Sequence, residues 1–452
     1  MNKEGFLKFR EIYSRFYLGV WYPTFVGVLV FLGHAFAIEL YLCALSVLVT
    51  SLGLVLTLRA RPLVFFVISF VYQVSRKNAP GIPEPSDYYF TSWRLAVLIL
   101  LIVIFLGAFS FYAARVRLFS LKNLRRVPLL IPLGVLSLAF ITNGLFSGKD
   151  STDSLVFGIM EALCYTVLFI VFYLILSKER EGLVDYIILC SLVLSLVLTL
   201  EVLWCYVAVD NPVKENLLFG WGIWNTAGVA LTVLLPTLLL GFARGRTWYI
   251  LPLGFAYFGA VVTMSRNALL VGTTVIALSL IAMAVYGKRR VFALVTIALG
   301  CALAIIGALV LGERLPLLVL GFFNDNGRLE IWRMGIEAFL SSPVFGVGFF
   351  GCDFGTFFTA DFLPTMAHNT FIQLLCCMGV FGLLSYLFYR GATLVPFVRH
   401  HSFEKTMLGI SVSALLLESL LDNFVFYFLP TLYYTVVLAA VFVIYNAERA
   451  EK

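Results

Sequence analysis

Apolar residues recur along the chain in long runs that are separated by short polar or basic connections. Within a run, apolar positions do not alternate with polar ones as they would in the strands of a membrane barrel, so the pattern predicts helices. A run of about 20 apolar residues is long enough to cross a bilayer as an α-helix. We therefore predict an all-α polytopic integral membrane protein with about 12–14 transmembrane helices.

The candidate spans divide the chain into three parts. Residues 1–311 form a transmembrane region of about 11 spans, residues 312–366 form one large loop, and residues 367–452 form the C-terminal transmembrane helices. The third run is short for a span, and a re-entrant segment is its alternative. The fourteen candidate spans lie at 17–33, 36–58, 61–75, 94–113, 127–147, 154–177, 183–208, 222–243, 248–264, 267–286, 291–311, 367–390, 405–420 and 424–445.

The distribution of basic residues predicts which side of the membrane each connection between the spans faces. With the N-terminus in the cytoplasm, 23 of the 32 Lys and Arg residues fall in cytoplasmic connections or tails, which is the bias that the positive-inside rule describes. We therefore expect both termini in the cytoplasm and the 312–366 loop outside. The net charge of +7 then favours contact with anionic lipid of the cytoplasmic leaflet over nucleic acid.

Composition excludes a water-soluble globule. Hydrophobic residues make up 61% of the chain and charged residues 13%, with a mean hydropathy of +0.99, whereas a soluble domain has about 25% charged residues. Seven of the eight cysteines fall in or at the start of apolar runs, and only Cys352 lies in a long loop. We therefore expect neither a disulfide framework nor a zinc site.

The external loop holds two features of its own. Its middle, "GRLEIWRMGIEAFLSS", spaces apolar residues as an amphipathic helix does, which predicts a helix lying on the membrane surface. The following "GVGFFG" matches a dinucleotide-binding pattern, but that pattern requires a preceding strand and a cytoplasmic nucleotide, so we reject this interpretation. The glycines are instead expected to allow a tight turn and close backbone approach to something bulky.

Three cationic or titratable residues fall on the external side of the map. Arg266 stands in "TMSRNALL" between two spans, Arg328 in "DNGRLEIW" at the start of the loop helix, and His368 in "MAHNTF" in the first turn of the twelfth span. Arginine is less frequent at the external surface of a membrane than at the internal one. The alternatives are that Arg266 snorkels, that Arg328 pairs with a helix carboxylate, and that His368 caps or packs.

Acidic residues also favour the outer side. Acidic side chains within spans are costly and usually functional, so their placement predicts a polar cavity that opens outward. The alternative is that span ends are simply polar, which explains Glu161 and Glu418 least well. We predict that these two carboxylates orient His368 or an arginine. The acidic residues in the outer portions of spans are Glu39, Glu161, Glu201, Glu418 and Asp422.

These motifs, in this order, resemble the conserved region of the O-antigen ligase and O-antigen polymerase family. The resemblance rests on "TMSRNALLVG", "NGRLEIWRMGIEAFLSSPVFGVGFFG" and "AHNTFIQLLCCMGVFGLLSYL", with "FGWGIWNTAGVALTVLLP" upstream, and so falls within residues 222–390. It implies an all-helical membrane glycosyltransferase of the C type in the bacterial cytoplasmic (inner) membrane, with residues 222–390 as the catalytic region.

The resemblance also implies a chemistry. A glycan would move from a polyprenyl diphosphate donor to a sugar hydroxyl of a glycan or lipid-linked acceptor at the outer face. Arg266 and Arg328 would hold the diphosphate without a metal or other cofactor, because guanidinium groups bind such oxygens in pairs and stay charged. His368 would accept the proton of the hydroxyl. Further expected substrate-binding residues are Asn225, Trp332, Asn369, Gln373, Glu161 and Glu418.

Two questions stay open at this point. The amides of Asn369 and Gln373 could equally bond neighbouring helices. A polymerase and a ligase share their chemistry and differ in acceptor, and a chain-length regulator or a flippase is a candidate partner. The alternative function is a transporter or flippase of the lipid-linked glycan, but such a protein would show internal pseudo-symmetry, which the two halves of the sequence lack.

Overall fold

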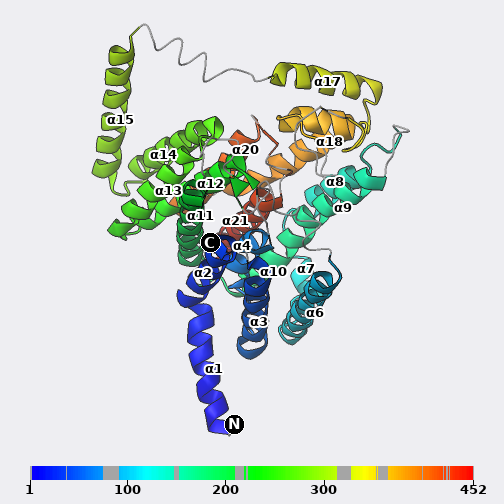
Figure 1. Ribbon diagram of the computed structural model, residues 1–452, viewed down its shortest axis with the longest axis vertical. Helices are drawn as coiled ribbons and strands as arrows, with labels where there is room; N and C mark the ends of the chain where they lie inside the picture. The colour runs from blue at the N-terminus through cyan, green and yellow to red at the C-terminus, as the bar shows by residue number, and fades with distance from the viewer. Residues whose placement is uncertain are drawn as a thin grey trace.

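The prediction of an all-α polytopic membrane protein is confirmed (Figure 1). Among the described residues, eight helices are long and apolar enough to cross a membrane, or nine if a bent pair counts as one span. The only strands in this part of the chain form a two-residue hairpin, β1 (Leu218–Phe219) with β2 (Gly222–Ile223). The computed structural model describes residues 3–36, 38–74, 91–146, 152–208, 218–219, 222–312, 327–352, 354, 365–399, 401–420, 422–423, 426 and 428–450.

Each of the fourteen predicted apolar runs contains a helix. The first eleven runs correspond to α2 (Trp21–Phe36), α3 (Glu39–Thr57), α4 (Leu63–Val74), α6 (Ser92–Arg115), α8 (Leu130–Ile141), α9 (Thr152–Ala162) with α10 (Leu168–Lys178), α11 (Leu183–Ala208), α12 (Trp224–Ala243), α13 (Ile250–Val262), α14 (Arg266–Val285) and α15 (Arg290–Leu311). The last three correspond to α18 (Thr370–Thr393), α20 (Phe403–Glu418) and α21 (Phe428–Ala450). The remaining helical segments are α1 (Lys3–Leu18), α7 (Leu121–Leu124), the π-helix η1 (Leu163–Val167), the 3-10 helix η3 (Thr247–Tyr249), α17 (Arg328–Ser341) and α19 (Val395–Arg399).

The predicted loop at 312–366 is described in part. Residues 313–326, 353 and 355–364 lie outside the described residues. A helix, α17, forms where the amphipathic pattern predicts one, and it lies over α18 in Figure 1. Whether α17 rests on a membrane surface, and which side of the membrane it faces, stay predictions.

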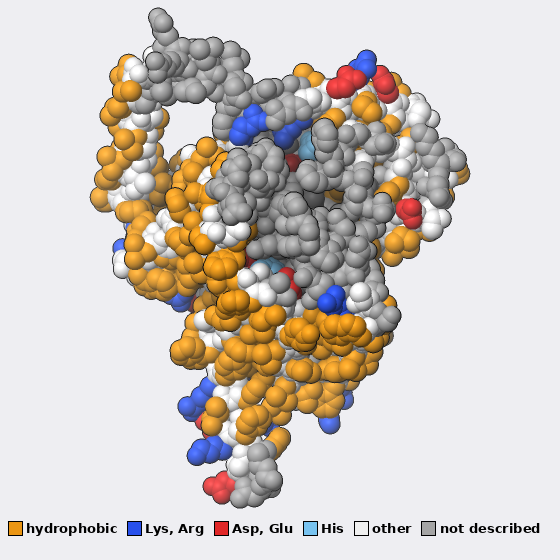
Figure 2. All heavy atoms as spheres, in the orientation of Figure 1, with side chains coloured by type: hydrophobic (Ala, Val, Ile, Leu, Met, Phe, Trp, Pro, Cys, Tyr) orange, Lys and Arg blue, Asp and Glu red, His pale blue; other side chains and the backbone are white. Residues whose placement is uncertain are grey.

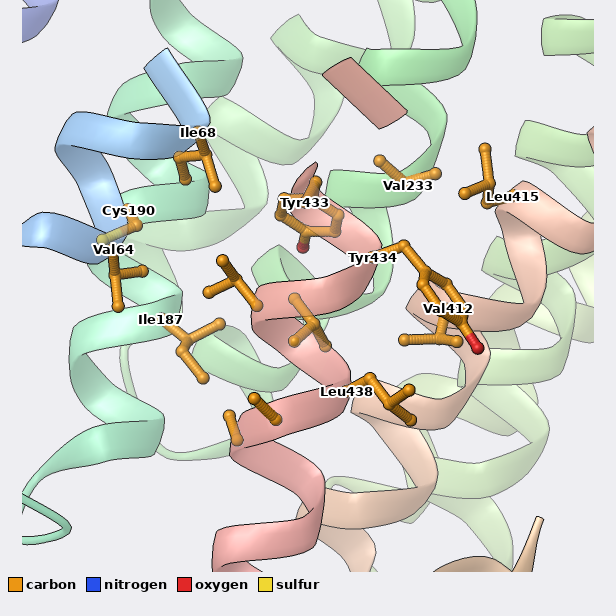
Figure 3. Close-up of a cluster of buried hydrophobic side chains, with 14 of the residues drawn as sticks. Val64, Ile68, Ile187, Cys190, Val233, Val412, Leu415, Tyr433, Tyr434 and Leu438 are labelled. Atoms are coloured by element: carbon orange, nitrogen blue, oxygen red, sulfur yellow. The ribbon is translucent and has the colours of Figure 1, made fainter. Parts of the chain in front are cut away.

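The last helix, α21, occupies the centre of the bundle. It packs against α4, α10 and α20, and every residue from Thr431 to Val443 is buried. Because its apolar side chains meet helices on all sides, α21 shows no single exposed face. Figure 3 shows this cluster around Tyr433, Tyr434 and Leu438 of α21, with Val64 and Ile68 of α4, Ile187 and Cys190 of α11, Val233 of α12, and Val412 and Leu415 of α20.

The helix α18 is broken inside the bundle. Gly379 takes a non-helical conformation with φ 63° and ψ −163°, so backbone groups on both sides of it lose their helical partners. At membrane depth such groups must bond within the protein. Residues 343–348 meet this need. On one side of the break, the N–H groups of Val347 and Gly348 donate to the carbonyls of Cys376 and Cys377, at 2.8 and 3.0 Å respectively. On the other side, the N–H groups of Val380 and Phe381 donate to the carbonyls of Pro343 and Val344, at 2.9 and 3.2 Å respectively.

Glycines make this backbone-to-backbone contact possible. A Cβ on Gly346 would lie 2.2 Å from the carbonyl carbon of Cys377, and one on Gly379 would lie 2.3 Å from the Val344 oxygen. Gly346 and Gly348 also have φ values of 70° and 87°, which side chains other than glycine rarely adopt. The predicted close backbone approach is therefore confirmed, and the broken helix is what approaches.

The glycine-rich segment packs within the helix bundle, although the hydropathy pattern predicts only a loop here. Phe349 is fully buried, and its ring packs against those of Phe140, Phe157 and Phe426. The Phe349 N–H donates to Oδ1 of Asn143 at 3.1 Å. The Phe350 N–H donates to Oγ of Ser154 at 3.0 Å. The hydropathy map missed this position because it assigns each segment to a side by its length and polarity alone.

A basic side chain is also enclosed by the bundle. This residue is Arg390, in the last turn of α18, which the distribution of Lys and Arg predicts at the cytoplasmic side. Its guanidinium lies over the rings of Tyr386, Tyr389 and Tyr434 at 4.6, 5.3 and 4.5 Å. Its three side-chain nitrogens are buried and form no hydrogen bond with a described residue. Cation–π attraction, worth about 0.5–2 kcal/mol per ring, therefore stabilises this charge.

We expect Gly346→Ala to destabilise the protein by at least ~2 kcal/mol, because the new methyl group meets the α18 backbone and strains a left-handed residue. The thermal midpoint in detergent measures the effect. The control is Gly254→Ala in α13, where nothing lies within 4 Å of the added Cβ, so alanine should be neutral or stabilising by up to ~1 kcal/mol. Equal midpoints for the two variants would contradict the role of Gly346.

Candidate functional site

α17 is tied to the residues that precede α18. Nε1 of Trp332 donates to the carbonyl of Ala367 at 3.0 Å. Gly335, one turn later, lies so close to Ile372 that a Cβ would fall 2.6 Å from its Cγ2. Arg328 stands four residues before Trp332 and therefore lies on the same face of α17. The contacts place the N-terminal end of α17 beside His368, and they give Trp332 a structural role in addition to the predicted one.

His368 lies just outside α18. The helix begins at Thr370 with Asn369 as its N-cap, so the prediction that His368 stands in the first turn is wrong by two residues. His368 has a φ of 51°, a left-handed conformation that turns the chain sharply into the helix. The ring of His368 is thereby held at the mouth of α18, with its side chain 29% exposed.

A buried carboxylate holds the ring of His368. Nδ1 of His368 lies 3.0 Å from Oδ1 of Asp422, whose side chain is only 3% exposed. An ionised carboxylate can only accept, so this hydrogen bond places the ring proton on Nδ1 and leaves the lone pair on Nε2. Oδ1 of Asp422 also accepts from the N–H of Asn423 at 2.8 Å. In the neutral form of the ring, Nε2 is therefore the nitrogen that can accept a proton.

This contact corrects the predicted orienting carboxylates. Glu418 lies one turn before Asp422 and is fully buried, but neither of its carboxylate oxygens bonds to a described residue. Glu161 is buried in α9 directly before η1, where its electrostatic neighbours are Cys164 and Tyr165. Sequence reasoning passed over Asp422 because a polar span end explained it. Its place four residues after Glu418 and next to Asn423 was the signal that could have found it.

The two amides near His368 bond the protein itself. Oδ1 of Asn369 accepts from the N–H groups of Phe371 and Ile372 at 2.9 and 3.1 Å, which caps α18. Nδ2 of Asn369 donates to the carbonyl of Leu420 at 3.0 Å. Between the two alternatives that the sequence left open, the structure shows bonds to neighbouring elements.

Gln373 is a positioning residue and not a substrate-binding one in this structure. It is fully buried, and Oε1 accepts from the Ala367 N–H at 2.6 Å and from Nδ2 of Asn423 at 2.8 Å. Nε2 donates to the Thr365 carbonyl at 3.3 Å and to Sγ of Cys377 at 3.1 Å. Gln373 thus fixes the backbone segment that carries His368. All of the bonding atoms of its amide are used within the protein, so none remains for a sugar hydroxyl.

Arg266 lies at the same end of the bundle. It is the first residue of α14, and Ser265 caps that helix through the N–H of Ala268 at 3.4 Å. α14 and α20 pack together and run antiparallel, because Oη of Tyr286 at the end of α14 lies 3.0 Å from Oγ1 of Thr406 at the start of α20. The start of α14 therefore lies at the end of α20, from which Glu418 and Asp422 extend.

Two further contacts join this end to α18 and α12. The Thr370 N–H donates to the carbonyl of Ser419, directly after α20, at 3.1 Å. In α12, a Cβ on Gly228 would lie 2.6 Å from that of Ala268. Asn225, three residues earlier in α12, is half-buried at the same end. In Figure 2, basic side chains lie beside a histidine and an acidic side chain on the viewed face, near the top of the molecule.

The arrangement brings two permanent cations and one base to a single end of the bundle. Guanidinium groups suit the oxygens of a phosphate or diphosphate, and an imidazole with a free Nε2 suits a hydroxyl proton. Within the described ranges, no group of three or more His, Cys, Asp or Glu side chains could hold a metal ion. The predicted independence from metal stays a prediction.

Residues 251–387 match the family model described as O-antigen ligase. This segment contains Arg266, Arg328 and His368, and the resemblance to the O-antigen ligase and polymerase family is confirmed over it. The match supports a glycosyltransferase function of that general type, with lipid-linked glycan substrates in a membrane. No curated protein matches the chain.

We expect Asn369→Ala to lower stability by about 0.5–2 kcal/mol, because α18 loses its cap. Asn369→Asp keeps an oxygen for the Phe371 and Ile372 N–H groups and loses only the donor to Leu420, so it should lose less. The thermal midpoints of both variants in the same detergent separate the contribution of the cap from that of the bond to Leu420. An alanine variant as stable as the wild type would show that the cap contributes nothing.

Proposed function

We propose that this protein, through its O-antigen ligase domain at residues 251–387, transfers a glycan from a polyprenyl diphosphate to a sugar hydroxyl. The observation that carries the proposal is the His368–Asp422 pair, whose half-buried imidazole keeps Nε2 free at the end of the bundle where α14 and α17 begin. The catalytic region is residues 222–390, and its partners are the lipid-linked donor, the glycan or lipid-linked acceptor, and the bilayer.

Arg266 and Arg328 would bind the leaving group. When the bond between the anomeric carbon and the diphosphate oxygen breaks, the electron pair stays on that oxygen, so negative charge on the diphosphate increases. Two guanidiniums can each donate paired hydrogen bonds to these oxygens and remain charged throughout. Because both residues begin a helix, the backbone N–H groups of the first turns add to the attraction for an anion.

His368 would act as the general base. The oxygen of the acceptor hydroxyl attacks the anomeric carbon as Nε2 takes up its proton, and the new glycosidic bond forms while the diphosphate leaves. Asp422 holds the Nδ1 proton and stabilises the imidazolium that results. Gln373, Asn369 and Trp332 position this residue through the 365–369 backbone and α17. Asn225, at the start of α12, would contact a sugar.

The proposed setting is the bacterial cytoplasmic membrane, with both termini in the cytoplasm and the site at the outer face. The asymmetric distribution of Lys and Arg supports this orientation, and the multi-pass helical fold supports the membrane placement. A polymerase would use a second lipid-linked repeat unit as acceptor, and a ligase would use a different glycan or lipid. The same arrangement of base and arginines serves both reactions.

We expect His368→Ala to reduce glycan transfer by about 10²–10⁴-fold while the protein remains folded, because the proton acceptor is removed. The assay uses purified protein, a polyprenyl-diphosphate-linked glycan and acceptor in detergent or vesicles. His401→Ala, which changes an exposed histidine of the α19–α20 connection, should retain full activity. Full activity in the His368 variant would remove its role as base.

We expect Arg266→Lys and Arg328→Lys each to slow transfer by about tenfold to a hundredfold, the equivalent of one charge-assisted hydrogen bond. A lysine keeps the charge but cannot replace the paired donors. Arg333→Lys is the matched control, because Arg333 lies on α17 and forms exposed pairs with Glu330 and Glu337. Wild-type rates for both site variants would show that these arginines are structural.

We expect transfer to continue unchanged when EDTA is added, because the two arginines supply the positive charge that a metal ion would otherwise supply. The rate of transfer before and after chelation gives the answer. Strong inhibition that magnesium or manganese reverses would contradict the two-arginine site.

A further inference from the structure

A second polar site lies at the other ends of the long helices. A cavity of about 730 Å³ is bordered by the C-terminal ends of α10 and α21 and by α7, and its polar lining includes Arg126, Tyr173, Lys178, Arg180, Asn446 and Arg449. α21 starts at Phe428, six residues after Asp422, and runs for 23 residues, which is roughly 35 Å. The cavity is therefore separated from the His368 site by about the thickness of a bilayer.

The charge of this cavity is unbalanced. Four of its lining residues carry a positive charge, and none of the described residues that line it is acidic. Nζ of Lys178 donates to the carbonyl of Val116 at 2.8 Å, which leaves its charge uncompensated. Arg126, Arg180 and Arg449 form no ion pair with the part of the chain that the structure describes. Four cations around one cavity repel one another, so a bound anion would stabilise them.

The floor of the cavity offers a directed hydrogen bond. Tyr173 is 5% exposed, and its hydroxyl oxygen accepts from Nδ2 of Asn446 at 2.8 Å. Because that bond uses the oxygen as acceptor, the hydroxyl hydrogen remains for an oxygen atom in the cavity. A buried hydroxyl donor and four cationic side chains that line the same cavity suit the oxygens of a phosphate group.

The surroundings indicate that the phosphate belongs to a lipid. Lys178 and Arg449 stand in the last turns of α10 and α21, which are apolar helices of membrane-spanning segments. The ends of membrane-spanning helices are expected at the depth of lipid headgroups, and Leu174, Val443 and Ala447 give the cavity an apolar wall. Basic pockets between spans at this depth bind anionic headgroups.

A neighbouring cavity of about 590 Å³ extends the basic surface. It shares Lys178 and Arg180 with the first and adds Arg59 and Arg61. Its lining also holds two carboxylates, those of Glu179 and Glu181, so four cations face two acidic side chains. The Glu179 side chain is buried, and its Oε1 accepts from the Ala60 N–H at 2.6 Å. Burial raises the pKa of Glu179, while the neighbouring Arg59 and Arg61 act in the opposite direction.

We propose that the cavity formed by Arg126, Tyr173, Lys178, Arg180 and Arg449 is a binding site for the phosphate headgroup of an anionic phospholipid. The bound lipid would join α10 to α21, the central helix, at the end of the bundle away from the transferase site. The site is independent of the proposed transfer reaction, because none of its residues takes part in that reaction.

The test compares lipid retention by the full chain in native mass spectrometry. Wild-type protein in mixed micelles should retain phosphatidylglycerol and not phosphatidylcholine. Each of Arg126→Gln, Arg180→Gln and Arg449→Gln should weaken retention about fivefold, and the triple variant about a hundredfold. Tyr173→Phe, which keeps every charge, should weaken it as well. Exposed Arg125, Arg290 and Arg399 line neither cavity, and their triple Gln variant loses the same charge and should retain lipid as the wild type does.

Three results would overturn the proposal. Equal losses in the cavity and control triple variants would show unspecific attraction to the basic surface. Unchanged retention in Tyr173→Phe and Arg449→Gln would place the lipid elsewhere, and these two variants decide the question if the triple variant does not fold. Displacement of phosphatidylglycerol by millimolar inorganic phosphate, with equal thermal stabilisation by phosphate alone, would assign the cavity to a soluble phosphate. Transfer activity should be the same in all variants when measured in phosphatidylcholine.

Discussion

Backbone groups in the interior of a membrane have no water to bond, and the break in α18 is where this constraint shapes the protein most. At Gly379 the helix gives up its own hydrogen bonds, and residues 343–348 replace them from a segment that lies within the bundle. Because that segment follows α17, the replacement also fixes α17 above α18. The position of Arg328 near the mouth of α18 thus depends on a set of bonds formed three turns deeper.

The site contains one accessible residue and several residues that hold it in place. His368 has an accessible ring, while Asp422, Gln373 and Asn369 are engaged in bonds that set the ring's place and the course of the chain around it. Amides with every atom bonded, one of them fully buried, leave few alternative arrangements, so the imidazole is held before any substrate arrives. Such preorganisation matters most for a base that must meet a hydroxyl at hydrogen-bonding distance.

Sequence could predict what depends on apolarity and on motif order. Each apolar run contains a helix, and the three motifs fall inside the matched domain. Sequence could not predict the break in α18, because "CCMGVFG" is as apolar as the helix around it and hydropathy carries no information on backbone direction. Asp422 was missed for a related reason: a polar residue at a span end has an ordinary explanation until its partner, 54 residues earlier in the chain, is seen beside it.

The tyrosine enclosure of Arg390 bears on how the chain is assembled. In the proposed orientation this arginine helps to retain the end of α18 on the cytoplasmic side during insertion, and in the finished bundle its guanidinium nitrogens are buried. Tyr434 belongs to α21, which is synthesised after α18, so the enclosure is open until α21 has been made. A chain cut short before α21 would expose both a polar side chain and the apolar surfaces around it, which are features that membrane quality-control proteases can recognise.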